Sequence, residues 1–189
     1  MIINYIKFSL IVFFFVISIF HKKVISENDK KLQAIALFFT VISDLFLVIL
    51  NWQAMGVFTF IFVQICYFVR LKINKKILPI YAFIFIILFF ICGEILLALA
   101  LTYGLIFITN YISAWKMFIK KEVPLVNTYL ILIGLTLFLL CDICVALYNL
   151  HLLNIHLSVT FLTFLSYSIW IFYIPSQLLL SFSSRNFSN

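Results

Sequence analysis

Long apolar runs recur along the whole chain and constrain its fold more than any other feature. Mostly apolar runs of about 18 residues or more are typical of helices that span a membrane. The 189-residue chain is 66% hydrophobic, and only 10% of its residues are charged, against about 25% in soluble domains. The sequence therefore predicts an all-α, polytopic membrane helix bundle that forms a single domain over residues 1–189.

We expect about seven transmembrane helices separated by short turns. The N-terminal apolar segment lacks a small-residue cleavage site, so we interpret it as a retained first helix rather than a signal peptide. Cys92, Gly93 and Glu94 must form a tight turn between the fourth and fifth helices. The expected helices cover residues 2–20, 32–50, 54–71, 77–92, 94–118, 125–148 and 157–182.

The positions of the basic residues predict the orientation of the bundle. Twelve of the 13 Lys and Arg residues follow the first, third or fifth helix or lie in the C-terminal tail, and Lys7 is the exception. Because short cytoplasmic loops carry an excess of Lys and Arg, we expect the N-terminus outside and the C-terminus in the cytoplasm. A bacterial cytoplasmic membrane is the expected location, and the net charge of +7 does not indicate nucleic-acid binding.

Three acidic residues lie in or beside the apolar segments, at Asp44, Glu94 and Asp142. A carboxylate deep in a bilayer costs about 2.5–3.5 kcal/mol on insertion scales, so its presence requires a reason. The expected topology places all three acids in the outer half of the membrane, in a layer without Lys or Arg. This arrangement predicts a shared polar cavity with a carboxyl group able to act as a general acid. Alternatively, each acid only bonds a neighbouring helix.

Asp44 and Asp142 also lie in similar local sequences. Each is followed seven residues later by an amide, Asn51 or Asn149. Seven residues are almost two helical turns, so acid and amide would share one helix face about 10 Å apart. The two segments would then form a parallel repeat, with both acids facing one pocket.

Polar residues on the third and seventh helices are candidates to complete this pocket. Gln64 and Tyr67 continue a helical stripe that begins at Gly56 and Phe60. On the seventh helix the candidates are Tyr173 and Gln177, with Pro175 between them, and Gln177 lies further from the acids. Each Gln could instead form only an interhelical hydrogen bond.

The cysteines and histidines do not indicate a metal or a cofactor. Cys141 and Cys144 form a C-x-x-C motif, but it lies on a predicted membrane helix without a second Cys pair or a nearby His. We therefore expect small core residues, no metal and no cofactor. We expect His151 and His156 to be solvated residues at the membrane interface or to contact a lipid head group.

Four short motifs resemble the YhhN family of lysoplasmalogenase-like membrane proteins, which includes the human transmembrane protein 86 pair. These motifs are S-D-L-F in the second helix, G-x-x-x-F-x-x-x-Q-x-x-Y in the third, C-D-I-C-V-A-L in the sixth and W-I-F-Y-I-P-S-Q-L-L in the seventh. The chain departs from the family in two respects. The family usually has eight spans, and it commonly has His where this chain has Gln64, which cannot shuttle a proton.

The resemblance implies hydrolysis of the vinyl ether bond of lysoplasmalogens to a fatty aldehyde and glycerophospho-ethanolamine or -choline. The substrate would be a membrane lipid with one chain, and Asp44 and Asp142 would be catalytic, although the sequence does not assign acid and base. The expected substrate-binding or supporting residues are Glu94, Asn51, Asn149, Gln64, Tyr67, Tyr173 and Gln177.

A small proton-coupled transporter of a lipid-like or small polar substrate is the alternative, because buried acids are typical of proton relays. A retinal protein is excluded, since residues 157–182 contain no Lys. The sequence leaves the oligomeric state open.

Overall fold

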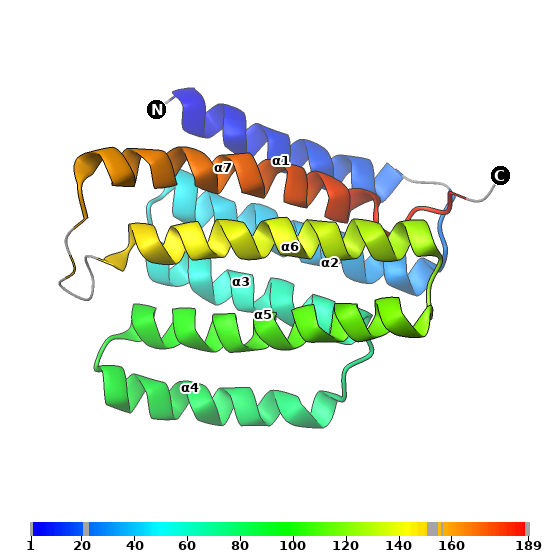
Figure 1. The fold of residues 1–189 in the computed structure, drawn as a ribbon, viewed down its shortest axis with the longest axis horizontal. Helices are drawn as coiled ribbons and strands as arrows, with labels where there is room; N and C mark the ends of the chain where they lie inside the picture. The colour runs from blue at the N-terminus through cyan, green and yellow to red at the C-terminus, as the bar shows by residue number, and fades with distance from the viewer. Residues whose placement is uncertain (1, 21–22, 151–154, 156, 188–189) are drawn as a thin grey trace.

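The described residues form a bundle of seven roughly parallel and antiparallel α-helices (Figure 1). The computed structural model describes residues 2–20, 23–150, 155 and 157–187, and these contain no named β-strand. A π-helical segment, Leu45–Ile49, follows α2, and a 3₁₀ turn, Lys75–Ile77, precedes α4. The α-helices are α1 (Ile2–Phe20), α2 (Glu27–Asp44), α3 (Gln53–Arg70), α4 (Leu78–Cys92), α5 (Ile95–Lys120), α6 (Leu125–Tyr148) and α7 (Val159–Phe182).

The helices have the lengths and composition of a polytopic membrane protein, which confirms the predicted fold class. Six of the described helical segments are long and apolar enough to cross a membrane, and α1 contributes a shorter apolar helix, Asn4–Phe20. The largest deviation from the expected boundaries is at α2, which begins at Glu27 instead of residue 32. Ser26 is extended at the N-cap, and the acidic Glu27 and Asp29 in the first turn interact favourably with the helix dipole.

The turns alternate between the two ends of the bundle (Figure 1). The turns after α1, α3 and α5 and the C-terminal tail lie at one end, which we call the basic end because these segments carry the Lys and Arg residues. The turns after α2, α4 and α6 lie at the opposite end, where α1 also begins. Gly93 ends α4 there with a left-handed φ of 68°, a conformation that costs glycine little, so the predicted tight turn forms.

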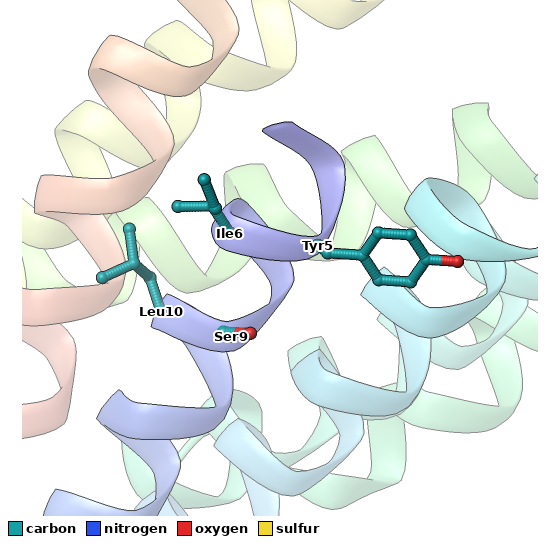
Figure 2. A pocket seen from close by; sticks show the side chains of 4 residues that line it. All are labelled: Tyr5, Ile6, Ser9 and Leu10. Atoms are coloured by element: carbon teal, nitrogen blue, oxygen red, sulfur yellow. The ribbon is translucent and has the colours of Figure 1, made fainter. Parts of the chain in front are cut away.

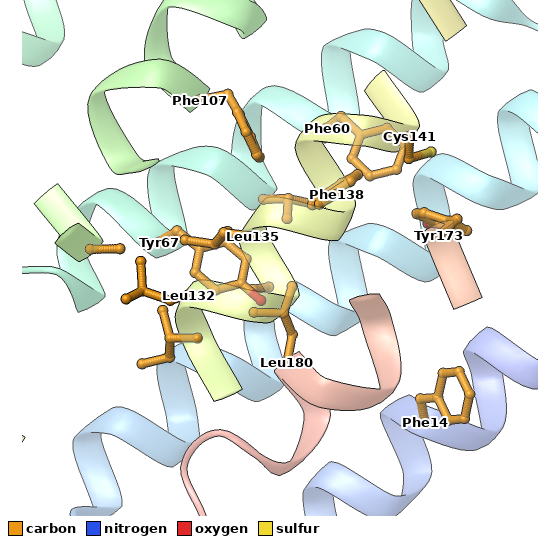
Figure 3. Close-up of a cluster of buried hydrophobic side chains, with 14 of the residues drawn as sticks. Phe14, Phe60, Tyr67, Phe107, Leu132, Leu135, Phe138, Cys141, Tyr173 and Leu180 are labelled. Atoms are coloured by element: carbon orange, nitrogen blue, oxygen red, sulfur yellow. The ribbon is translucent and has the colours of Figure 1, made fainter. Parts of the chain in front are cut away.

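The core is built from aromatic and aliphatic side chains of six helices (Figure 3). No residue of α4 is buried, and this helix packs against α5 at the edge of the bundle (Figure 1). Helices α6 and α7 pack closely together, as do α2 and α3, and α3 joins these two halves through α5. The interior between α2, α3, α5, α6 and α7 contains the polar residues described below.

The π-helical segment after Asp44 packs against the start of α3 at a glycine. A Cβ atom at Gly56 would overlap with the side chain of Leu47 in the π segment. Close by, the Ser43 hydroxyl donates to Thr59 Oγ1 at 2.7 Å and ties α2 to α3. Gly56 therefore permits the close helix contact that holds the segment carrying Asp44.

We expect Gly56→Ala to lower the free energy of unfolding by about 1–3 kcal/mol, the usual cost of adding a methyl group to a packed core. The measurement is reversible unfolding in mixed detergent–SDS micelles followed by circular dichroism. Gly104→Ala is the matched control, because no atom lies within 4 Å of a Cβ added there. Equal destabilisation by the two substitutions would contradict the close-packing role of Gly56.

Candidate active site

Each of the two interior aspartates accepts a hydrogen bond from a tyrosine on another helix. The Tyr173 hydroxyl, on α7, donates to Asp44 Oδ2 at 2.7 Å. The Tyr103 hydroxyl, on α5, donates to Asp142 Oδ2, also at 2.7 Å. Asp44 is only 3% exposed, whereas Asp142 is partly buried. We call these the Asp44 pair and the Asp142 pair.

The two pairs meet around a shared group of aromatic rings. The Tyr173 ring centroid lies 5.8 Å from that of Phe138, the Phe138 ring 5.9 Å from Phe60, and the Phe60 ring 6.1 Å from Tyr103. Figure 3 shows Tyr173, Phe138, Phe60 and Cys141 close together. These three ring contacts connect the Asp44 pair with the Asp142 pair through the interior of the bundle.

A buried amide network extends from the Asp142 pair. The Gln64 side chain donates to the Tyr103 hydroxyl at 3.5 Å, and Asn110 Nδ2 donates at 2.9 Å to both the side-chain and backbone oxygens of Gln64. Gln64 and Asn110 are both fully buried. The donors are therefore aligned in one direction, from Asn110 through Gln64 and Tyr103 to the carboxyl group of Asp142.

The predicted repeat of acid and amide is broken after Asp44. Asn51 lies in the turn after the π segment with a φ of 56°, where its side chain accepts from Gln53, and it is exposed. Asn149 is the C-cap residue of α6 and donates to the Val145 carbonyl. The helical phase changes in the π segment and the helix then ends, so the seven-residue spacing does not place Asn51 on the face of Asp44.

The other predicted site residues fall into two groups. Glu94 is exposed in the turn between α4 and α5, outside the region of the two pairs. Tyr67 and Gln177 are buried in the interior, and Tyr67 lies nearer the basic end, with its ring centroid 6.0 Å from the Arg70 guanidinium carbon. The stripe expected on α3 is confirmed, because Gly56, Phe60, Gln64 and Tyr67 are all buried.

The expectation that no basic residue shares the layer of the aspartates was wrong. Lys7, on α1, places its ammonium nitrogen 4.2 Å from the Trp170 ring centroid, and Trp170 packs edge-on against Tyr173 at 5.7 Å. Lys7 faces inward because it shares a helix face with the buried Ile11 and Phe14. No ion pair joins either interior aspartate to Lys7 or to any other described basic residue.

A surface hollow of about 420 Å³ on α1 is separate from the two pairs (Figure 2). Its lining residues are Tyr5, Ile6, Ser9 and Leu10, which include the most exposed side chains of this part of α1. In a membrane this apolar face would contact lipid. The hollow is therefore not part of the candidate site.

Two residues of the candidate site were not predicted from the sequence: Tyr103 and Asn110. The available signal was polarity, because Tyr103 and Asn110 interrupt an apolar run seven residues apart. The described residues contain no cluster of three or more His, Cys, Asp or Glu side chains that could hold a metal ion. The four cysteines are free thiols, and His151 and His156 lie outside the described residues.

Fold and site together define a polytopic helical membrane protein with two interior carboxyl–tyrosine pairs. No family model matches the chain, and neither a curated protein nor a solved structure matches it.

Proposed function

We propose that the protein is a lysoplasmalogenase-like hydrolase that cleaves the vinyl ether bond of lysolipids inside the membrane. The observation that carries this proposal is that two interior carboxyl groups, Asp44 and Asp142, are each bonded by a tyrosine, and that one row of aromatic rings connects the two tyrosines. The four motifs that resemble the YhhN family add support, and two of them contain these aspartates. The substrate class is a phospholipid with one alkenyl chain.

Vinyl ether hydrolysis needs an acid, an anionic group and one water molecule. The acid transfers its proton to the alkenyl carbon remote from the ether oxygen, which leaves an oxocarbenium ion. Water adds to the carbon bound to oxygen as the anionic carboxylate takes a proton, giving a hemiacetal. The hemiacetal hydroxyl then returns a proton to the first carboxylate while the second protonates the departing glycerol oxygen. The products are an aldehyde and an alcohol, and both carboxyl groups recover their initial states.

We base the assignment of these roles on the different surroundings of the two aspartates. Donors aligned from Asn110 and Gln64 through Tyr103 point at Asp142, which suits a carboxylate that stabilises a cation and activates water. Asp44 is almost fully buried and accepts a hydrogen bond from Tyr173. Among the described residues, no amide side chain donates to the Tyr173 hydroxyl as Gln64 does to Tyr103. These surroundings suit a carboxyl group that acts as the proton donor. Two carboxyl groups with separate roles set by their environments serve other enzymes that pass through oxocarbenium-like ions.

The tyrosines act as positioning residues in this mechanism. We expect Tyr173→Phe and Tyr103→Phe each to lower kcat about fivefold, the effect of losing a hydrogen bond of about 1 kcal/mol that holds a carboxyl group. KM should change little, because the phenyl ring keeps the packing. Steady-state aldehyde release in detergent micelles measures both constants. The control is Tyr111→Phe, whose hydroxyl bonds Thr136 instead, and equal kcat values in all three variants would exclude the positioning role.

The direct test compares two lipids that differ in one bond. Purified protein is incubated with a lysoplasmalogen and with the ester lysolipid of the same chain length, and products are identified by mass spectrometry. Release of aldehyde from the first lipid without fatty acid from the second supports the proposal. If neither lipid is cleaved, the hydrolase proposal is wrong, and pH-dependent substrate flux in liposomes then tests the carrier alternative.

We also propose that the basic end faces the cytoplasm of a bacterial cell. The Lys and Arg residues cluster at that end of the bundle, as the positive-inside rule requires. Reporter fusions test this orientation: a C-terminal green fluorescent protein should be fluorescent and a C-terminal alkaline phosphatase inactive. The reverse result would invert the topology and place the two pairs in the cytoplasmic half of the membrane.

A further inference from the structure

Several fully buried polar atoms between α2 and α7 have no hydrogen-bond partner within the described part of the protein. They are Gln33 Oε1 on α2 and both Ser176 Oγ and Gln177 Nε2 on α7. All three side chains are 1% exposed or less. Buried polar groups are almost always hydrogen-bonded, and in a membrane the cost of leaving one unbonded is several kcal/mol. These atoms therefore indicate a polar ligand that the protein encloses.

Two sets of hydrogen bonds fix how the polar faces of α2 and α7 meet. Near the middle of the bundle, Tyr173 of α7 bonds Asp44 of α2. Toward the basic end, Gln33 Nε2 of α2 bonds the backbone carbonyls of Leu180, at 2.7 Å, and Ser181. Gln33 and Asp44 are 11 residues apart, about 16 Å along the helix and on the same face.

Ser176 and Gln177 lie between these two points along α7, and Gln33 lies at the second point. Thr40 is buried on the face of α2 shared by Gln33 and Asp44. Ser176 and Gln177 lie one helical turn beyond Tyr173 and one turn before Leu180. We call Thr40, Ser176, Gln177 and Gln33 the polar track. Gln33 and Thr40 are seven residues apart on α2, about 10 Å along the helix, and Ser176 and Gln177 are neighbours on α7, so a connection along the track takes several water molecules.

The track ends close to groups that reach the surface at the basic end. Arg70, buried at the end of α3, bonds Asp29 of α2 and the Ser183 hydroxyl after α7. Asp29 lies four residues, one helical turn, before Gln33 on the same helix, and its side chain is 27% exposed. Polar groups therefore run from the basic end to the Asp44 pair.

We propose that a chain of ordered water molecules occupies the polar track and connects the Asp44 pair with the aqueous phase at the basic end. Water is the ligand whose chemistry fits, because the unbonded atoms include both acceptors and a donor, and buried waters typically bridge such groups. The inference deepens the proposed function, since hydrolysis consumes one water per substrate. The lipid can then enter from the membrane while water arrives through the interior.

X-ray hydroxyl-radical footprinting of the full-length protein in lipid nanodiscs tests the track without measuring activity. Radicals form from ordered water during millisecond exposure and oxidise the nearest side chains, which mass spectrometry quantifies. Tyr173, 4% exposed, and Phe107, 1% exposed in the apolar core, are compared after correction for their rates in unfolded protein. We expect Tyr173 to be oxidised about tenfold faster, because bound water lies next to it.

Substitutions within the track identify the route that the water takes. Ser176→Val combined with Gln177→Leu, and separately the near-isosteric Thr40→Val, should lower the oxidation rate of Tyr173 several-fold. The matched control is Ser168→Val, since Ser168 is buried and bonds a carbonyl of its own helix, as Thr40 does, but is not a member of the polar track. The Thr40 variant tests the route even if the double variant does not fold.

The outcomes separate this inference from the proposed function. Oxidation of Tyr173 no faster than that of Phe107, or unchanged by the folded track variants, would overturn the water chain even if aldehyde is released. Rapid oxidation of Tyr173 that the track variants slow, in a protein that releases no aldehyde, would support the water chain and contradict the proposed hydrolase activity.

Discussion

Asp44→Asn and Asp142→Asn should each lower the rate of aldehyde release by about 10²–10⁴-fold, the usual contribution of a general acid or base. An amide has nearly the same shape as a carboxyl group, but it can neither deliver a proton to carbon nor balance a developing positive charge. The Asn side chain can still accept the tyrosine hydrogen bond through its oxygen. The protein should therefore fold, and the measurement is the initial rate of aldehyde formation at saturating lysoplasmalogen.

The control for these two variants is Glu122→Gln, the same chemical change at a carboxylate that is 42% exposed in the turn between α5 and α6. Helicity and elution volume of all three variants should match those of the unmodified protein. Full activity in both Asp variants would exclude the mechanism, whatever reaction the protein catalyses. Activity lost in one variant alone would mean that one carboxyl group performs both roles.

Arg70→Met should lower the free energy of unfolding by about 3 kcal/mol, the lower end of the cost of breaking a buried ion pair. The Arg70 side chain is 2% exposed and binds both carboxylate oxygens of Asp29, with distances of 2.8 and 2.9 Å. Its third bond, at 2.8 Å, fixes Ser183 and thus the end of α7. Truncating Arg70 leaves the Asp29 carboxylate and the Ser183 hydroxyl without this partner.

The same ion pair anchors the C-terminal segment, which strengthens the expected effect. Asn127 of α6 donates to the backbone carbonyls of Ser183 and Arg185, and Val24 forms an antiparallel bridge with Arg185. Unfolding in mixed micelles measures the loss of unfolding free energy. Lys120→Ala is the control, because the Lys120 side chain is 68% exposed and lies 3.9 Å from Glu122. Such surface pairs contribute little. Comparable losses in both variants would contradict a special role for Arg70.

Helix number and helix ends could be predicted because they depend on local composition. A span needs about 20 apolar residues and a turn needs a break in that run, and both are visible in the sequence. The early start of α2 at Glu27 has a local cause. The first turns of this helix are rich in charged residues, so the hydropathy of the sequence did not assign them to a membrane span. The location of all the basic turns at one end of the bundle was predicted for the same reason.

The partners of the aspartates could not be predicted, because they depend on how distant helices pack. Asp44 and Tyr173 are 129 residues apart, and no spacing rule relates them. The repeat suggested a symmetric pocket lined by Asn51 and Asn149, but the π segment at Leu45–Ile49 breaks the helical phase after Asp44. In the sequence, Tyr103 does not differ from the other aromatic residues of its helix. Its hydrogen bond to Asp142 depends on the packing of α5 against α6.

The sequence by itself determined that this chain forms a bundle of apolar helices with two acidic residues held among them, since insertion energy is a sum over neighbouring residues. Only the tertiary structure decided which groups those acids meet: tyrosines from α5 and α7, a shared set of aromatic rings, and Lys7 one ring away. The physical reason is that side-chain hydrogen bonds act over about 3 Å, and helix packing alone sets such distances.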